Sequence, residues 1–459
     1  MELKGKKVLV VGLGKSGLAA ALFLRHQGAQ VTVSDVRSAE ALAKDIPALL
    51  EEGIMVEAGG HGLLTFRRQD LIVVSPGVPL NTPELVQVKS FGLPVIGELE
   101  LAARFLKGKM LAITGSNGKT TTTALVGEIL EKSGIPTLVG GNIGVPVVSL
   151  IDQSTDETWS VLEVSSFQLE STDQFHPSIA VILNITPDHL DRHGTFENYA
   201  LAKERIFAAQ NADDCVVLNA DNPRAAQAAT RSSASVHWFS MEHAVTQGAW
   251  LADGYVVYRD SPEAPMEKVI SLSAIPLKGA HNVENVLAAV CASRKAGAPA
   301  EVIRSTIESF QAVEHRLEYV ATINGVEYYN DSKATNVDAT LKAVAAFQSG
   351  IHLILGGKDK GSDYTLLSPL LRSRVRSIYT IGSAAAKIES QLRGVVSIHS
   401  CETLESAVSA AASAARPGEV ILLAPACSSF DQFESYEHRG RIFKELVTER
   451  RSWKAWQNS

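Results

Sequence analysis

The chain has 459 residues, of which 45% are hydrophobic and 20% charged, a composition typical of a folded globular protein rather than a disordered one. At roughly 150 residues per domain, this length predicts about three domains. The 43 lysines and arginines against 50 aspartates and glutamates give a net charge of −7. This balance argues against a general binder of nucleic acid or anionic membranes, because such proteins need a basic surface.

Cysteine usage and the N-terminus bear on the cellular compartment. The four cysteines are far apart and form no CxxC pair, which indicates neither a disulfide framework nor a zinc site and fits a reducing compartment. Three early lysines followed by an apolar run resemble an export signal, but Gly12, Gly14 and Lys15 interrupt that run. The sequence has no run of 18 apolar residues that could form a transmembrane helix. We therefore expect a cytoplasmic protein without membrane attachment.

Short apolar runs rich in β-branched residues alternate with helical patterns along the first half of the chain. This rhythm indicates βαβ units built on parallel sheets. Helices are also expected between Gly97 and the strand that begins at Met110, and from Thr122 to Lys132. The predicted strands are Val8–Val11, Val31–Ser34, Leu71–Val74, Met110–Thr114, Trp159–Val164, Ile179–Asn184 and Cys215–Asn219.

The pattern changes between Val236 and Leu272 to short alternating strands with a turn at Asp253-Gly254, which indicates a small antiparallel appendage. Helices are predicted next at Asn282–Lys295 and Ala300–Phe310. From Gly325 the α/β rhythm resumes. The predicted elements there are strands Val326–Tyr329, Ile351–Leu355, Ser377–Ile381, Val395–His399 and Glu419–Leu423, and helices Asn336–Phe347 and Leu404–Ala415.

The first polar motif is Gly12-Leu13-Gly14-Lys15-Ser16-Gly17, which follows a predicted strand and opens a helix, with Asp35 at the end of the next strand. In a Rossmann unit such glycines let the backbone approach a pyrophosphate at a helix N-terminus, and the acid accepts a hydrogen bond from a ribose hydroxyl. Three interpretations fit this motif: a nicotinamide dinucleotide site, a site for another nucleotide diphosphate, or a glycine-rich structural turn.

The second motif is Thr114-Gly115-Ser116-Asn117-Gly118-Lys119-Thr120-Thr121, between a predicted strand and a predicted helix. Its backbone N–H groups can cradle phosphates, Lys119 can reach the β and γ oxygens, and the Thr120 hydroxyl can hold Mg²⁺. The spacing departs from the standard phosphate loop because Ile113 stands where the leading glycine would be. The alternative is a capped helix start without a ligand.

With these motifs in place, the elements predict an α/β protein of three domains. Residues 1–98 form a Rossmann-like N-terminal domain, and residues 99–312 form a central domain of the P-loop ATPase type with the antiparallel appendage. Residues 313–459 form a Rossmann-like C-terminal domain. The boundaries near Gly97 and Val313 are soft, because element ends are the least certain part of such a prediction.

Three metal-ligand or charged side chains follow later strands of the central domain: Glu163, His189 and Lys203. The carboxyl ends of parallel strands meet at one edge of a sheet, so Glu163, His189 and the phosphate loop can converge there. Mg²⁺ takes oxygen ligands and usually keeps waters. Taken one by one, these residues fit a solvated strand end or a turn equally well.

Further polar residues lie at strand ends and in loops of the last third of the chain. An arginine among them could stabilise transferring phosphoryl charge, and lysines could hold a carboxylate. On spacing alone, solvated loops explain these residues slightly better than a binding site does. The group comprises Asn282, Asn285, His315-Arg316, the run from Asn330 to Asn336, and Gly356 to Lys360.

Taken together, the motifs resemble those of the Mur ligases, across all three predicted domains. The chain is most similar to the Mur ligases that act on D-glutamate, through its first glycine loop, SPGVP at 75–79 and PACSSFDQF at 425–433. The shared motifs are TGSNGKTTT, GGNIG at 140–144, LEVSSFQLE at 162–170, NITPDHLDRH at 184–193, HNVEN at 281–285, EHR at 314–316, NDSKATN at 330–336 and GGKDKG at 356–361.

The resemblance implies an ATP-dependent amide ligase with an acyl-phosphate intermediate, acting in peptidoglycan precursor synthesis. ATP would transfer its γ-phosphoryl group to the carboxylate of UDP-N-acetylmuramoyl-L-alanine, and the amine of D-glutamate would displace phosphate. The alternatives are a related Mur or folylpolyglutamate-type ligase that uses another amino acid, or a nucleotide-binding oxidoreductase or sensor. The implied cofactors are ATP and Mg²⁺, with two ions, and the implied state is a monomer whose partners are small-molecule substrates.

The resemblance also implies roles for individual residues of the central domain. The implied catalytic residues are Lys119, Glu163, His189 and Lys203, of which Lys203 matches a lysine that carries a carbamate. Thr120 joins Glu163, His189 and Lys203 as a metal ligand or neighbour. The implied ATP-binding residues are Gly115, Ser116, Asn117, Gly118, Lys119, Thr120, Thr121, Asn282, Asn285, Arg316 and Asp331.

The two outer domains would bind the other substrates. The N-terminal domain would hold UDP, so the first glycine loop would serve a UDP-sugar rather than a nicotinamide cofactor. One departure is Lys358, where some relatives carry an acid, which puts the local contacts there in doubt. The implied UDP-substrate residues are Lys15, Ser16, Asp35, Arg37, Gly77, Asn142 and Gln168; the implied D-glutamate residues are Lys333, Thr335, Lys360, Ser429 and Phe430, with Tyr436 as a less certain neighbour.

Overall fold

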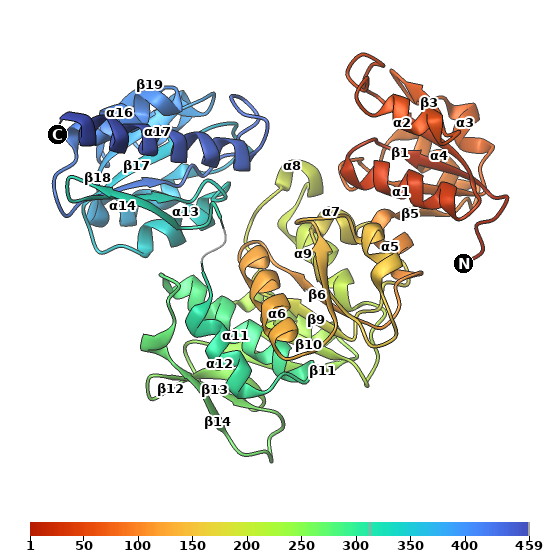
Figure 1. Cartoon of the computed structure of the whole chain (residues 1–459), viewed down its shortest axis with the longest axis horizontal. Coiled ribbons are helices and arrows are strands. Elements are labelled where there is room, and N and C mark those ends of the chain that lie inside the picture. The colour runs from red at the N-terminus through yellow and green to blue at the C-terminus, as the bar shows by residue number, and fades with distance from the viewer. Residues whose placement is uncertain (312–313, 458–459) are drawn as a thin grey trace. The chain divides into compact units, whose positions relative to one another are not determined.

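The computed structural model describes residues 1–311 and 314–457, and it contains three sheets (Figure 1). The chain divides into two compact units. The first comprises Met1–Ile185, Thr195–Ala274 and Glu284–Glu308, and the second comprises Thr186–Gly194, Ile275–Val283 and the chain from Ser309 onward. The predicted boundary at Val313 lies outside the described residues. No helix of the described chain is long and apolar enough to cross a membrane.

The first sheet has five parallel strands in the order β3-β2-β1-β4-β5. Leu9 of β1 packs with α3 and α4 on one face, and Val10 packs with α1 on the other. Strands β3 and β5 are absent from the sequence prediction because they are short and only partly buried. The elements are β1 (Lys7–Val11), α1 (Lys15–His26), β2 (Gln30–Asp35), α2 (Ile46–Glu51), β3 (Met55–Ala58), α3 (Leu63–Arg67), β4 (Leu71–Val74), α4 (Pro83–Ser90) and β5 (Val95–Gly97).

The second sheet has nine strands in the order β14-β13-β12-β11-β10-β9-β6-β8-β7. Its elements begin with α5 (Glu98–Ala103), β6 (Lys109–Thr114), α6 (Lys119–Lys132), β7 (Thr137–Gly141), η1 (Val147–Gln153), β8 (Trp159–Glu163), α7 (Ser166–Leu169), β9 (Ile179–Ile182), α8 (Leu190–His193) and α9 (Phe196–Glu204). They continue with η2 (Arg205–Phe207), β10 (Cys215–Asn219), α10 (Pro223–Gln227), η3 (Ala228–Arg231), β11 (Ser235–Ser240), β12 (Gly248–Ala252), β13 (Tyr255–Arg259), β14 (Glu267–Ser271), η4 (Leu272–Ala274), α11 (Ala280–Lys295) and α12 (Ala300–Ser309).

The predicted antiparallel appendage is the edge of this same sheet. Strands β12, β13 and β14 pair antiparallel to one another, whereas β11 pairs parallel with both β10 and β12, which corrects the expected start of the antiparallel region at Val236. Asp253 and Gly254 connect β12 to β13, and both have positive φ. Two-residue hairpin turns favour this conformation, and an Asp-Gly pair adopts it at low cost.

The third sheet has the order β15-β16-β20-β17-β18-β19, with only the β15–β16 pair antiparallel. Helices α13 and α14 cover one face, where Leu353 and Leu355 point, and helices α16 and α17 cover the other, where Ile354 points (Figure 1). The elements are β15 (Glu318–Ile323), β16 (Val326–Asn330), α13 (Val337–Ala345), β17 (Ile351–Gly356), η5 (Tyr364–Leu367), α14 (Ser368–Arg374), β18 (Val375–Ile381), α15 (Ala385–Gln391), β19 (Ser397–Glu402), α16 (Leu404–Ala414), β20 (Val420–Leu423) and α17 (Tyr436–Gln457).

The inner parallel strands of the first and third sheets, such as β1 and β17, are buried on both faces, so polar groups on these strands can reach solvent only at the strand ends. The same principle explains why the polar motifs of the sequence follow strands.

Candidate active site

The phosphate loop connects β6 to α6, as its glycines and position predict. Gly118 has a φ of 89°, in the left-handed region that favours glycine, and a Cβ built there would overlap with Asn285 Oδ1. Asn285 therefore lies directly against the loop. The loop leads into α6, whose first turn contains Lys119, Thr120 and Thr121. The backbone N–H groups of a first helical turn can donate to the oxygens of a phosphate.

Asn184, directly beyond β9, holds the loop in place. Its Oδ1 accepts a hydrogen bond from Asn117 N at 2.9 Å, and its Nδ2 donates to Asn117 O at 3.1 Å. Its own backbone carbonyl accepts a hydrogen bond from Ser116 N at 2.9 Å. The sequence placed Asn184 at the end of a predicted strand and at the start of the shared motif 184–193, but assigned it no role at the phosphate loop.

Lys119 Nζ donates hydrogen bonds to two carbonyls of the loop, Gly115 O at 2.7 Å and Ser116 O at 3.0 Å. The ammonium therefore lies on the loop itself. A cation at this position is placed to meet phosphate oxygens.

Glu163 ends β8 and is 1% exposed. Its Oε2 accepts a hydrogen bond from Thr120 Oγ1 at 2.8 Å, and its Oε1 accepts one from Asn142 Nδ2 at 2.8 Å. A carboxylate beside a threonine hydroxyl at a phosphate loop supplies the hard oxygen donors that Mg²⁺ prefers, so these residues fit the ion. Asn142, which the resemblance assigns to the UDP-substrate, contacts this carboxylate directly.

Lys203 on α9 also contacts the phosphate loop and is 1% exposed. Its Nζ donates to Gly115 O at 2.9 Å and lies 3.4 Å from Thr114 Oγ1. The same Nζ lies 4.7 Å from the centre of the Tyr199 ring, and the Tyr199 hydroxyl contacts Ser116 Oγ at 3.0 Å. The structure therefore brings Lys203, Glu163 and the loop together in the first unit.

His189 belongs to the second unit, in the segment that follows β9. It has a φ of 52° and precedes α8, with Nε2 3.7 Å from Asp188 Oδ2. Asp188 in turn accepts a hydrogen bond from Asn336 Nδ2 at 2.9 Å, and Lys360 Nζ lies 3.8 Å from its Oδ1. Within this unit, Asp188 therefore contacts Asn336 and Lys360, which lie on two of the three segments that carry the predicted amino-acid residues.

Those residues gather around the carboxyl ends of β16, β17 and β20. Lys333 Nζ donates to Tyr436 Oη at 3.0 Å, and Lys358 exchanges backbone hydrogen bonds with Ser428. Ser429 is 2% exposed, whereas Phe430 is 67% exposed. Some relatives carry an acid where this chain has Lys358. The Lys358 side chain is exposed, and the hydrogen bonds with Ser428 come from the backbone, so they do not depend on which side chain stands here. Thr335 lies in the turn before α13.

In the second unit Asp331 is buried and Arg316 is half-buried, and the charge of Arg316 acts on the Asp331 carboxyl. Burial raises the pKa of Asp331 to about 6, while the charge of Arg316 and the backbone N–H of Leu317 act in the opposite direction. Asp331 Oδ1 and Arg316 Nε are both buried without a hydrogen-bond partner. Such buried groups are costly unless they bind something, which fits a polar ligand at this position. Asn282, also in this unit, donates to Lys278 O at 2.7 Å.

In the first sheet, Asp35 connects the glycine loop to Arg37. The carboxylate accepts hydrogen bonds from Leu13 N at 2.7 Å and from the Arg37 guanidinium at 2.9 and 3.0 Å. These bonds outweigh burial and lower the pKa of Asp35 to about 2. Gly17 lies so close to Gly12 O that any side chain would overlap with it. Lys15 and Ser16 open α1 beside this loop, and a Cβ built at Gly77 would meet no other atom within 4 Å.

Gln168 has a structural role at α7. Its Oε1 accepts hydrogen bonds from Ser165 N at 3.0 Å and Ser165 Oγ at 3.1 Å, which completes a capping box. This use of Oε1 was not expected from the sequence.

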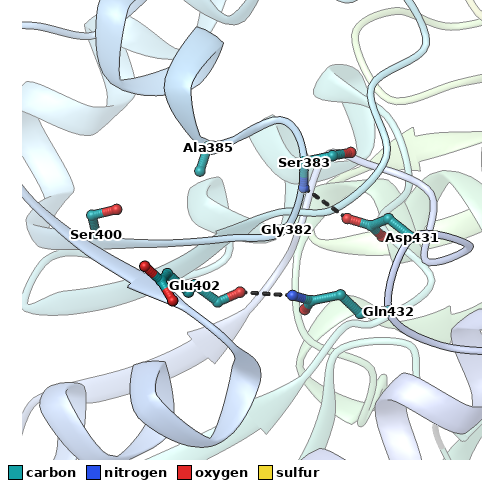
Figure 2. Close-up of a pocket in the computed structure, with 7 residues that line it drawn as sticks. All are labelled: Gly382, Ser383, Ala385, Ser400, Glu402, Asp431 and Gln432. Carbon is teal, nitrogen blue, oxygen red and sulfur yellow. Dashed lines mark hydrogen bonds between the residues drawn. The ribbon is translucent and has the colours of Figure 1, made fainter.

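A pocket of about 280 Å³ lies at the ends of β18 and β19, beyond the Ser429-Phe430 turn (Figure 2). Ser383 N donates to Asp431 Oδ2 at 2.8 Å, and Gln432 Nε2 donates to Glu402 O at 2.7 Å. None of the predicted site residues lines this pocket. The two hydrogen bonds hold Asp431 and Gln432, which directly follow Phe430 in the chain.

Three family models match the chain. A Mur ligase MurD-like N-terminal domain matches residues 6–97, a Mur ligase middle domain matches residues 113–293, and a Mur ligase glutamate ligase domain matches residues 315–427. Each of the three matched ranges corresponds to one of the three sheets of the fold.

Curated relatives and solved structures agree with the family models. The chain is 68% identical to the UDP-N-acetylmuramoylalanine–D-glutamate ligase of Acidobacterium capsulatum over 100% of both chains. It is 60% identical to the ligase of the same name from Koribacter versatilis, over 97% of this chain and 98% of that one.

Two solved structures have a similar fold. A pseudomurein peptide ligase type C from Methanothermus fervidus has a TM-score of 0.61 at 21% identity, over 97% of this chain and 100% of that one. The MurF ligase of Thermotoga maritima, in complex with ADP, has a TM-score of 0.60 at 17% identity, over 92% and 95%. On the strength of the full-length sequence identities, the chain belongs to the Mur ligase family, in the group of the UDP-N-acetylmuramoylalanine–D-glutamate ligases.

Proposed function

We propose that this chain is an ATP-dependent ligase that joins D-glutamate to UDP-N-acetylmuramoyl-L-alanine in peptidoglycan precursor synthesis. The observation that carries the proposal is 68% identity, over the whole chain, to a relative named for this reaction. The contacts of the phosphate loop support its ATP-dependent half.

A carboxylate is a poor electrophile, so the alanyl carboxylate must be activated before an amine can attack it. The loop from Gly115 to Thr121 binds the phosphates of ATP through its backbone N–H groups, and Lys119 neutralises charge on the transferring group. A carboxylate oxygen attacks the γ-phosphorus, ADP leaves, and the acyl phosphate remains. The unprotonated amine of D-glutamate then adds to the acyl carbon, loses a proton, and expels inorganic phosphate.

Thr120 and Glu163 are the residues that would hold one Mg²⁺ ion, and His189 is assigned to a second. The ion supplies charge neutralisation for the β- and γ-phosphates. Both candidate ligands in the first unit are buried oxygens 2.8 Å apart, which favours this assignment.

We further propose that Lys203 is carbamylated in the active protein. The neutral Nζ bonds to the carbon of CO₂ and releases a proton, which leaves an anionic carbamate. An ammonium at this position, beside the loop that holds Mg²⁺, would repel the ion, whereas a carbamate attracts it. The depth of Lys203, 1% exposed and against Gly115, supports a role in the site rather than in solvation.

The other substrates are assigned to the outer sheets. Lys15, Ser16, Asp35, Arg37 and Gly77 contact or flank the first glycine loop and would bind UDP. Lys333, Thr335, Lys360, Ser429 and Phe430 would bind D-glutamate, with Asn282, Asn285, Arg316 and Asp331 around the nucleotide. We assign domains at 1–98, 99–312 and 313–459 and propose a cytoplasmic monomer.

The test is phosphate release from ATP in the presence of UDP-N-acetylmuramoyl-L-alanine and Mg²⁺, with D-glutamate, L-glutamate, L-lysine or no amino acid. We expect release only with D-glutamate. Phosphate release with only L-glutamate or only L-lysine would support the ligase reaction but assign it a different amino-acid substrate. No release with any of the amino acids would overturn the proposal.

A further inference from the structure

Arg439, on the first turns of α17, is 0% exposed. Its Nε donates to Ser332 Oγ at 2.9 Å and its Nη2 to Ser332 O at 2.7 Å. Both terminal nitrogens donate to Cys427 O at 3.2 Å, and Nη1 lies 3.4 Å from Ser428 O. One guanidinium therefore joins two segments that are about a hundred residues apart in sequence.

All these acceptors are hydroxyl or carbonyl oxygens, and none is a carboxylate. Burial lowers the pKa of Arg439 to about 10, which leaves the group charged at neutral pH. Placing a charge in the interior without a hydrogen-bonded counter-ion costs stability, and an apolar side chain of similar volume would often cost less. The fold alone does not explain an arginine at this position.

The two segments carry four of the five residues assigned to D-glutamate, all except Lys360. Ser332 precedes Lys333, and Ser428 precedes Ser429. The first turn of α17 adds two further bonds to the same region: Ser332 Oγ donates to Tyr436 O at 2.8 Å, and Lys333 Nζ donates to Tyr436 Oη at 3.0 Å. Arg439 thus donates to Ser332 and Ser428, the residues directly before the proposed substrate contacts Lys333 and Ser429.

The far end of the second segment has its own anchors. Asp431 accepts a hydrogen bond from Ser383 N, and Gln432 donates to Glu402 O, as Figure 2 shows. Ser429 and Phe430 lie between these bonds and the Arg439 contacts. The position of Ser429 relative to Lys333 is therefore set by the Arg439 contacts together with one direct main-chain bond between the segments, from Ala426 N to Ala334 O at 2.9 Å.

We propose that Arg439 is a positioning residue for the amino-acid substrate, which fixes Lys333 and Ser429 at the spacing that D-glutamate requires. This inference rests on the proposed function. A lysine in its place keeps the charge but lacks the planar fork of donors that reaches both segments at once.

The test compares Arg439→Lys and Arg439→Met with the wild type, and uses Arg441→Lys and Arg441→Met as matched controls because Arg441 is exposed on the same helix. In Arg439→Lys we expect the KM for D-glutamate to rise about tenfold or more, the scale of lost charge-assisted hydrogen bonds. The KM values for ATP and for the UDP-substrate should stay within about twofold, because no Arg439 contact reaches the phosphate loop. Equal changes in all three KM values, or no change for D-glutamate, would overturn the inference.

Hydrogen–deuterium exchange provides a readout that does not depend on the reaction. In Arg439→Lys, amides of residues 330–336 and 427–432 should exchange faster than in the wild type, with the first sheet unchanged. If the wild-type chain shows no D-glutamate-dependent phosphate release, the proposed function fails whatever these amides do. If release is normal and the two segments exchange as in the wild type, the positioning role alone fails. If Arg439→Met does not fold, the KM values and the hydrogen–deuterium exchange of Arg439→Lys test the inference.

Discussion

Asn184 and Asn117 form a reciprocal pair in which one side-chain amide satisfies both the N–H and the carbonyl of a single phosphate-loop residue. The pair connects the end of β9 to the loop after β6, the strand beside it in the sheet. The shape of the loop is therefore set by its glycines and also by a neighbouring strand.

Replacing Asn184 with Asp keeps the acceptor for Asn117 N and removes the donor to Asn117 O. We expect the Kd for ATP to rise about tenfold and the free energy of unfolding to fall by about 1–2 kcal/mol, the cost of a lost buried hydrogen bond. Calorimetric titration with a non-hydrolysable ATP analogue measures the Kd, and urea denaturation measures the free energy of unfolding. Asn211→Asp is the control, because Asn211 is exposed and uses only its acceptor, toward Asp213 N. Wild-type nucleotide affinity in Asn184→Asp would contradict this account of the loop.

Lys119→Ala should abolish phosphoryl transfer, with a fall in kcat of about a thousandfold or more, because the charge on the transferring group loses its nearest cation. The fold should be unchanged, since Lys119 Nζ contacts only loop carbonyls among the bonds described above. Phosphate release measures the fall in kcat, and the midpoint of thermal unfolding shows whether the fold is unchanged. Normal turnover in this variant would remove the phosphate-loop assignment.

Glu163→Gln replaces one side of the proposed metal pair with a neutral amide of the same shape. We expect the Mg²⁺ concentration for half-maximal phosphate release to rise about tenfold or more, because Mg²⁺ binds a carboxylate far better than an amide. Chelation with EDTA should stop the wild-type reaction, and added Mg²⁺ should restore it. An unchanged Mg²⁺ requirement in Glu163→Gln would exclude Glu163 as a ligand.

Glu98, at the start of α5, predicts a pH dependence of stability. Burial raises its pKa to about 7 from 4.5, although Val148 N donates to its Oε1 at 2.7 Å; its Oε2 is buried without a partner. Between these two pKa values the folded state keeps a proton that the unfolded state releases, so stability falls as pH rises through this window. The total loss is about 3 kcal/mol.

Glu98→Gln keeps the acceptor for Val148 N and cannot titrate. Urea denaturation at pH 5, 6, 7 and 8 should show the variant gaining stability relative to the wild type as pH rises, with no further gain above about pH 8. Parallel curves for the two proteins across this range would show that Glu98 is not the titrating group.

Much of the fold followed from the sequence, because buried parallel strands are continuous apolar runs. The strand that ends at Val11 and the one that ends at Leu355 are examples, and both lie within the observed strands β1 and β17. Strands β3, β5 and β15 could not be predicted in this way, because β3 and β15 are partly exposed and β5 has three residues. Their positions depend on neighbours in the sheet.

The site shows a similar limit. The closeness of Glu163 to the phosphate loop followed from strand order, since groups at strand ends share an edge. Lys203 lies on helix α9, and only the resemblance assigned it to the site. Arg439 gave no such signal, because an arginine on a highly charged helix looks solvated until the packing of α17 is known. The bond from Asn184 Nδ2 to Asn117 O could not be predicted either, because it depends on how the phosphate loop packs against the segment after β9.

The most direct test of the central claim follows an oxygen atom. UDP-N-acetylmuramoyl-L-alanine labelled with ¹⁸O in its carboxylate is incubated with ATP, Mg²⁺ and D-glutamate, and the released phosphate and the nucleotide product are analysed by mass spectrometry. The account predicts one ¹⁸O atom in each inorganic phosphate formed and a product that has gained one D-glutamate residue in amide linkage. Unlabelled phosphate, or labelled phosphate without that product, would contradict it.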